Sequence, residues 1–244
     1  VFLSLGLPAL IVTTLYYGFT ALTQKPFDPH AKHKQGYSQD YSLTYVANPN
    51  TITPNQEIEF TFEVIDKRTN KKVEKFNIIQ EKLMHLVIIS KDLNYYDHIH
   101  PNYNDNSTFT IKTSFPKEGT YNFYLEYSPP DFSENVSQIE IKTTNAPQIE
   151  NANIKVDPEK KVFDQTYQIT LTKGSELKTT ENIDLVFNIK NVNSGQDVKN
   201  IKPYLGAFGH LAIVSEDSKT YTHVHPLDIP KTPEDRGGPN IGFN

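Results

Sequence analysis

Cysteine is absent from the 244 residues of this chain. Its absence excludes disulfide bonds, thiolate catalysis and thiolate metal ligands. It also excludes an electron-transfer blue-copper centre, because that site requires a cysteine thiolate. On redox grounds alone, the chain fits an oxidising or a reducing compartment.

Clustered lysine and arginine are also lacking, and the formal net charge is −5. Phosphate binding requires clustered positive charge, so we do not expect a nucleic-acid partner. Convincing helical periodicity is missing after residue 24. Short alternating apolar runs take its place, separated by turns rich in proline, asparagine, glycine, aspartate and lysine, which predicts β-strands.

About seven such runs follow one another in the first half of the chain. They cover residues 41–47, 57–65, 82–90, 95–100, 107–113, 119–127 and 136–143. This number of short strands is typical of an immunoglobulin-like or cupredoxin-like β-sandwich. We therefore predict an all-β fold.

The first 22 residues carry no charge, which is typical of a membrane-spanning helix. A cleaved secretory signal is the alternative, but its apolar part is usually shorter and ends at a small-residue site, which Ala21-Leu22-Thr23 matches weakly. We predict an uncleaved transmembrane anchor over residues 1–23 and a polar linker over residues 24–40. Both alternatives place the rest of the chain on the extracytoplasmic side. His30 and His33, in the linker, are expected to be solvated.

One histidine motif occurs twice, with a constant offset of 125 residues. The first copy contains His85, His98 and His100, and the second contains His210, His223 and His225. Six of the eight histidines thus belong to the motif.

The repeat extends beyond the histidines, because residues 58–62 match residues 183–187 at the same offset. We predict tandem sandwiches, domain 1 over residues 41–146 and domain 2 over residues 147–244. Domain 2 is short by comparison, and we expect the natural chain to continue with a segment like residues 119–127.

Each copy of the motif reads as a β-hairpin, with two apolar runs around a short polar break. A four-residue loop at residues 91–94 sets His85 opposite His100 and His98 opposite Val87. Side chains alternate along a strand, so the three imidazoles share one face, and directly opposed residues lie ~5 Å apart. The second copy follows the same count.

Neutral imidazole binds zinc, copper and nickel, and three such rings can hold one ion at about 2 Å from each nitrogen. We therefore predict one copper or zinc site in each domain. The predicted ligands are His85, His98 and His100 in domain 1 and His210, His223 and His225 in domain 2. The alternative is that the histidines are packing residues that hydrogen-bond the backbone or one another.

Other repeated residues have simpler interpretations. Ser90 and Asp92 fall in the hairpin loop and are expected to bond local backbone rather than to form a nucleophile pair. Tyr96 and Tyr221 share the histidine face and are expected to be core aromatics, with a hydrogen bond to a ligand as the alternative. Met84 points to the opposite face and is expected in the core.

An enzyme is not predicted. No repeated carboxylate joins the histidine face, because Asp97 lies on the other side of the strand and is Thr222 in the second copy. A general base beside a bound ion is therefore not apparent.

The motif H-L-x-x-x-S-x-D-x-x-x-Y-x-H-x-H-P, with residues 204–210 before its second copy and Gly237-Gly238-Pro239 after it, resembles a family of bacterial exported or membrane-anchored proteins. These are described as secreted, as heavy-metal-associated or as relatives of YtkA-like β-domains. The resemblance covers most of residues 41–244. It implies an association with metal, and a second domain that continues past the Gly-Gly-Pro segment with a strand like residues 119–127.

Two functions follow as predictions. The first is a membrane-anchored, extracytoplasmic protein that binds copper or zinc for metal handling or sensing. The second is a cell-surface structural or interaction protein, in which the repeated histidines are structural.

Overall fold

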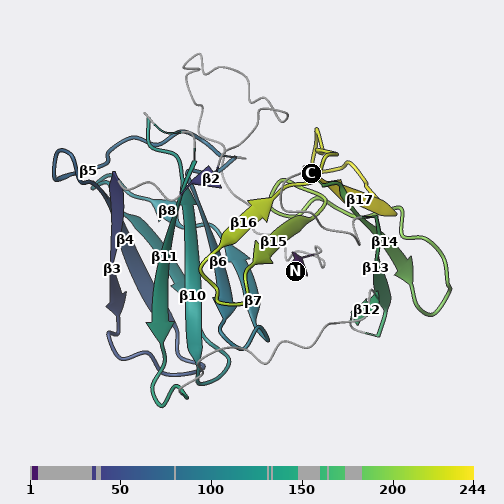
Figure 1. Cartoon of the computed structure of the whole chain (residues 1–244), viewed down its shortest axis with the longest axis horizontal. Helices are drawn as coiled ribbons and strands as arrows, with labels where there is room; N and C mark the ends of the chain where they lie inside the picture. Colours follow the sequence, from purple (N-terminus) through teal and green to yellow (C-terminus); the bar gives the residue numbers. More distant parts are fainter. Residues whose placement is uncertain are drawn as a thin grey trace. The chain divides into compact units, whose positions relative to one another are not determined.

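The computed structural model describes residues 2–4, 35–36, 40–79, 81–130, 132, 134–147, 160–163, 165–173 and 183–244. Every regular element in these residues is a β-strand (Figure 1). The strands are β1 (Phe2–Ser4), β2 (Gln35–Gly36), β3 (Tyr41–Asn48), β4 (Ile58–Asp66), β5 (Lys71–Lys72), β6 (Met84–Ser90), β7 (Tyr96–Ile99), β8 (Asn102–Tyr103), β9 (Phe109–Thr113), β10 (Thr120–Tyr127), β11 (Glu134–Lys142), β12 (Lys160–Phe163), β13 (Tyr167–Lys173), β14 (Leu185–Asn191), β15 (His210–Val214), β16 (Tyr221–Val224) and β17 (Asn240–Phe243).

The first domain is built from two sheets. One has the strand order β3-β4-β9-β8, with β5 paired to β4, and the other has the order β2-β11-β10-β6-β7. Figure 1 shows β6, β7, β10 and β11 side by side in the second sheet. All seven predicted strands are confirmed, and sequence reasoning missed only the two-residue strands β2, β5 and β8 in this part of the chain.

The apolar side chains between these sheets form the core. Along β4, buried and half-buried residues alternate, because Ile58, Phe60 and Phe62 point to the same face. Phe60 contacts Phe123 of the opposite sheet edge to face, with ring centroids 5.1 Å apart. Met84 is fully buried in this core, as predicted.

The strands β6 and β10 differ from β4, because they are buried along their whole length. A strand whose residues are all buried has both of its faces covered. The outer face of the second sheet, which carries the histidines, is therefore shielded from solvent at these two strands.

The second repeat forms a sheet of order β12-β13-β14-β17, and β15 pairs with β16 and with β1. In this repeat β17 pairs with β14 as β9 pairs with β4 in the first. Its core lies around Phe187, Ile189, Leu211 and Phe243.

The chain divides into two compact units. One contains residues 33–155 and 214–222, and the other contains residues 1–32, 156–213 and 223–244. The hairpin loop of the second motif thus belongs to the same unit as the first sandwich. The predicted domain boundary at residue 147 borders residues outside the described part of the chain.

Among the described residues, no helix has the length and apolar character needed to cross a membrane. Of residues 1–40, where the anchor and linker are predicted, the structure describes residue 40 and the short strands β1 and β2. The rest lies outside the described residues, so the transmembrane helix and the linker stay predictions.

Candidate metal centre

The first histidine trio forms at one end of the β6–β7 hairpin. His85 lies in β6, His98 in β7, and His100 one residue after β7. Val87 is the register partner of His98, as the loop count predicted. The three side chains therefore lie on the outer face of the sheet.

The ring nitrogens of this trio converge. Nδ1 of His85 lies 3.2 Å from Nε2 of His98 and 3.0 Å from Nε2 of His100. One nitrogen from each ring lies within 4.8 Å of the other two. His85 and His98 are buried and His100 is half-buried. The sequence prediction that these three imidazoles meet is confirmed, and the arrangement could hold a metal ion.

The remaining nitrogen of His85 bonds the backbone. Its Nε2 lies 2.9 Å from the carbonyl oxygen of Ile79, which only accepts hydrogen bonds. A hydrogen bond to this carbonyl requires the proton on Nε2, and in a neutral ring that would leave a lone pair on Nδ1.

The second trio repeats the main contacts. Nδ1 of His210 lies 3.3 Å from Nε2 of His223, and Nε2 of His210 lies 2.9 Å from the carbonyl oxygen of Tyr204. The ring centroid of His225 lies 5.0 Å from that of His210 and 4.3 Å from that of His223. The two outer rings are inclined at 51°, against 89° for His98 and His100 in the first trio. The rings thus gather in a different orientation, and their role as ligands stays a prediction.

A buried carboxylate joins the face of the first trio, and sequence reasoning missed it. Glu126 of β10 pairs with His85 of β6, so its side chain leaves the sheet on the same side. Glu126 is only 4% exposed. The sequence does contain one indication of this buried carboxylate, because Glu126 is the single acidic residue in the otherwise apolar and aromatic run 123–127.

Residues 214–222 contact this face within the same unit. The ring of Tyr221 stacks on that of Tyr124 with centroids 4.2 Å apart, and the Tyr124 hydroxyl donates to the carbonyl oxygen of Ser218 at 2.8 Å. Burial, with the nearby charge of Glu126, raises the pKa of the Tyr221 hydroxyl well above its usual value. Tyr221 is thus a buried aromatic residue, as predicted.

The serine and aspartate of the motif shape the hairpin loop. The Ser90 hydroxyl donates to Asp92 at 2.6 Å and accepts from the backbone N–H of Tyr95 at 2.8 Å. In the second copy, Ser215 donates to Asp217 at 2.7 Å. The predicted turn role is confirmed.

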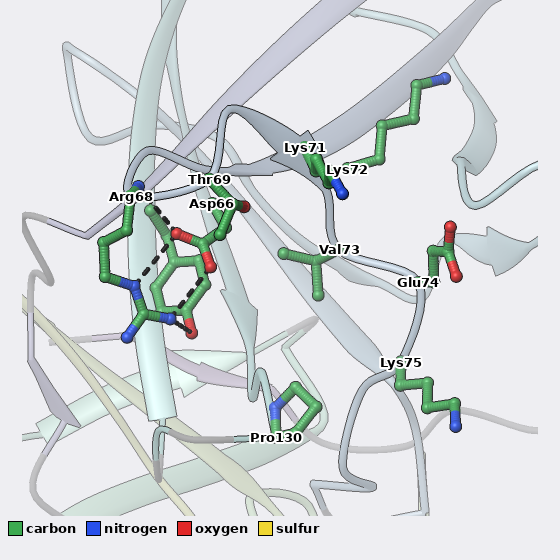
Figure 2. Close-up of a pocket in the computed structure, with 10 residues that line it drawn as sticks. Asp66, Arg68, Thr69, Lys71, Lys72, Val73, Glu74, Lys75 and Pro130 are labelled. Atoms are coloured by element: carbon green, nitrogen blue, oxygen red, sulfur yellow. Dashed lines mark hydrogen bonds and ion pairs between the residues drawn. The ribbon is translucent and has the colours of Figure 1, made fainter.

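A separate pocket of about 700 Å³ lies beside β3 and β5. Figure 2 shows Arg68 joined by hydrogen bonds to Asp66 inside it, with distances of 3.0 and 3.1 Å. The Arg68 side chain lowers the pKa of the Asp66 carboxyl. Among the described residues, no histidine lines this pocket, and its arginine is already neutralised. The first histidine trio is therefore the stronger candidate site.

A family model matches residues 38–144 and 160–244, which is more than half of the chain. The chain belongs to the DUF8832 family. That family is described as a domain of unknown function, so membership identifies relatives without assigning an activity. The two matched segments correspond to the two copies of the repeat, and the resemblance to YtkA-like β-domains stays a prediction.

Curated proteins gave no match to this DUF8832 chain. Two solved structures are similar to it. The structure of S. aureus TarS matches at 10% identity and a TM-score of 0.20. The structure of S. aureus TarS 217–571 matches at 12% identity and a TM-score of 0.21. The matches cover 79% and 80% of this chain, and 34% and 54% of the TarS chains. The chain thus spans about a third and about half of those lengths, and TM-scores this low carry no argument about function.

Proposed function

We propose that the chain is a metal-binding protein, with His85, His98 and His100 as the ligands of a copper or zinc ion. The main support is one observation. Nε2 of His98 and Nε2 of His100 both approach Nδ1 of His85, at 3.2 and 3.0 Å. An ion bound by imidazoles at about 2.0 Å in tetrahedral geometry holds its ligand nitrogens about 3.3 Å apart. Both contacts of His85 Nδ1 lie within a few tenths of an ångström of that separation.

Hydrogen bonding among the three rings explains these two short contacts less well than a bound ion does. Nδ1 of His85 has one lone pair, because its ring proton lies on Nε2 at the Ile79 carbonyl. One lone pair accepts one well-directed hydrogen bond, but two Nε2 atoms face it. A cation at the centre interacts favourably with all three nitrogens.

The chemistry of the donors narrows the choice of ion. Imidazole nitrogen suits zinc and copper, whereas magnesium and calcium prefer oxygen donors. Three protein ligands also leave a fourth position at a zinc ion for water or another group. We extend the proposal to His210, His223 and His225 as a second site.

The cellular setting belongs to the same proposal. The uncharged stretch over residues 1–22 supports a membrane anchor, and the resemblance to exported, metal-associated proteins supports an extracytoplasmic position. A protein of this kind would handle or sense metal outside the cytoplasm.

Metal analysis of the purified full chain tests the proposal. After treatment with a chelator, the chain is dialysed against zinc or copper and the bound metal is counted. We expect at least one tightly bound equivalent, and one equivalent fewer when His98 and His100 both become alanine. His33→Ala is the matched control and should keep the metal. No bound metal in the unaltered chain would reject the proposal.

A structural role is the second candidate, and the bond between buried His85 and the Ile79 carbonyl favours it. Buried polar groups are usually satisfied in this way without any ion. In that case the double alanine variant loses thermal stability, and added metal changes neither protein. The chain would then be a cell-surface structural or interaction protein.

A further inference from the structure

A tight turn precedes the leading histidine in both copies of the motif. In the first, the backbone N–H of Lys82 donates to the Ile79 carbonyl at 3.0 Å, and that of Ile79 donates to the Lys82 carbonyl at 2.8 Å. In the second, Ala207 and Tyr204 exchange the same two bonds at 3.1 and 2.8 Å. The two turns are related by the offset of 125 residues, so they belong to the repeated unit.

The first carbonyl of each turn has two partners. The Ile79 oxygen accepts from Lys82 and lies 2.9 Å from Nε2 of His85. The Tyr204 oxygen accepts from Ala207 and lies 2.9 Å from Nε2 of His210. A carbonyl oxygen has two lone pairs and no proton, so each carbonyl can serve both donors. The proton of each leading imidazole is thereby held on Nε2.

A neutral imidazole carries one proton, so Nδ1 of each leading histidine keeps a lone pair. That lone pair is directed at the partner rings, with His98 Nε2 at 3.2 Å in the first copy and His223 Nε2 at 3.3 Å in the second. The other tautomer would place a proton at the centre of the trio and exclude an ion.

Both turns contain residues in a costly backbone conformation. Glu81 has φ of 71°, and Leu205 and Gly206 have φ of 50° and 83°. Glutamate and leucine adopt the left-handed region at a cost in free energy, which glycine avoids. Such conformations persist where the surrounding structure requires them, and they cluster at functional sites.

We propose that these two turns are positioning devices that select the Nε2–H tautomer of His85 and His210. The turn carbonyl fixes the ring and leaves Nδ1 as the nitrogen available to an ion. The link to metal rests on the proposed function, but the choice of tautomer does not. Carbonyl groups that orient a ligating histidine are a general feature of metal sites, where their loss typically weakens binding 10- to 100-fold.

Nuclear magnetic resonance of the metal-free full chain, labelled with ¹⁵N at histidine, tests the tautomer directly. Correlations between ring nitrogens and carbon-bound protons distinguish protonated from bare nitrogen. We expect a protonated Nε2 and a bare Nδ1 in His85 and His210. A proton on Nδ1 of His85 would overturn the proposal, whether or not the chain binds metal.

A matched pair of variants tests the turn itself. Glu81 is exposed, so its replacement changes the backbone preference of the turn with little effect on packing. Glu81→Gly suits the positive φ and should keep both the tautomer and the affinity for zinc. Glu81→Val disfavours that conformation and should mix the two tautomers and weaken zinc binding about 10- to 100-fold.

The outcomes separate the two proposals. If the unaltered chain has the expected tautomer but binds no zinc, the proposed function fails and the positioning role stands. If Glu81→Val keeps both the single tautomer and the full affinity, the turn is not a positioning device. If thermal stability falls in Glu81→Val while both readouts stay unchanged, the turn is structural only, which also rejects the proposal.

Discussion

Replacing His100 with alanine separates metal binding from packing, because His100 is half-buried and lies just beyond the end of β7. In the metal-free chain the change removes the contact of 3.0 Å between His100 Nε2 and His85 Nδ1. A hydrogen bond of this kind contributes about 0.5–1.5 kcal/mol to the free energy of unfolding. We therefore expect a modest loss of stability without metal.

Added metal should widen the difference in stability between the unaltered chain and His100→Ala. A ligand at a hundred times its dissociation constant stabilises the folded state by about 2.7 kcal/mol. In a domain of this size, each kcal/mol raises the melting temperature by about 4–8 °C. Zinc should therefore raise the melting temperature of the first sandwich by about 10–20 °C, and His100→Ala should lose most of that gain.

Differential scanning calorimetry of both proteins, with zinc and with a chelator, measures the two effects separately. We expect a small difference in melting temperature between the two proteins in chelator and a large one in zinc. An equal zinc-induced rise in the two proteins would place the ion elsewhere. No rise in either protein would refute metal binding by the trio.

Three further predictions concern the fold. Phe123→Ala opens a cavity between the two sheets, where Phe123 is fully buried, and should lower the free energy of unfolding by about 3–5 kcal/mol in urea titrations. Partial burial alone would raise the pKa of the Asp92 carboxyl, but hydrogen bonds, including one from Lys117, lower it overall. The stability contributed by this carboxylate is therefore present above about pH 4 and lost at lower pH. Asp92→Asn should therefore destabilise the chain at pH 7 by about 1 kcal/mol and make its melting temperature less sensitive to acid below pH 4. Gly237→Ala would place a methyl group 2.7 Å from the Phe208 ring and should destabilise the second repeat by about 1–3 kcal/mol, measured by hydrogen exchange.

The hairpins could be predicted because loop length fixes strand register. Residues 91–94 form the loop, and the backbone N–H of Ser90 bonds the Tyr95 carbonyl at 3.0 Å. With that register, the alternation of side chains places His85 and His98 on one face. Sequence alone was sufficient for this part of the site.

The rest of the site depends on contacts that a side-chain pattern does not encode. The Ile79 carbonyl is a backbone group, and its place beside His85 accompanies the backbone pairing of Ile79 with Lys82. Glu126 belongs to a strand about 40 residues away in sequence, and only the β6–β10 pairing brings it next to His85.

X-ray absorption of the full chain, loaded with one equivalent of zinc, identifies the atoms that bind the ion. We expect a first coordination shell that contains three imidazole nitrogens at about 2.0 Å, with the scattering pattern of whole histidine rings. The pattern should persist when His210, His223 and His225 become alanine, which removes the second proposed site, and should be lost when His85, His98 and His100 become alanine as well. A shell of oxygen donors alone in the unaltered chain, or loss of the histidine pattern when only the second trio is replaced, would contradict a metal site at His85, His98 and His100.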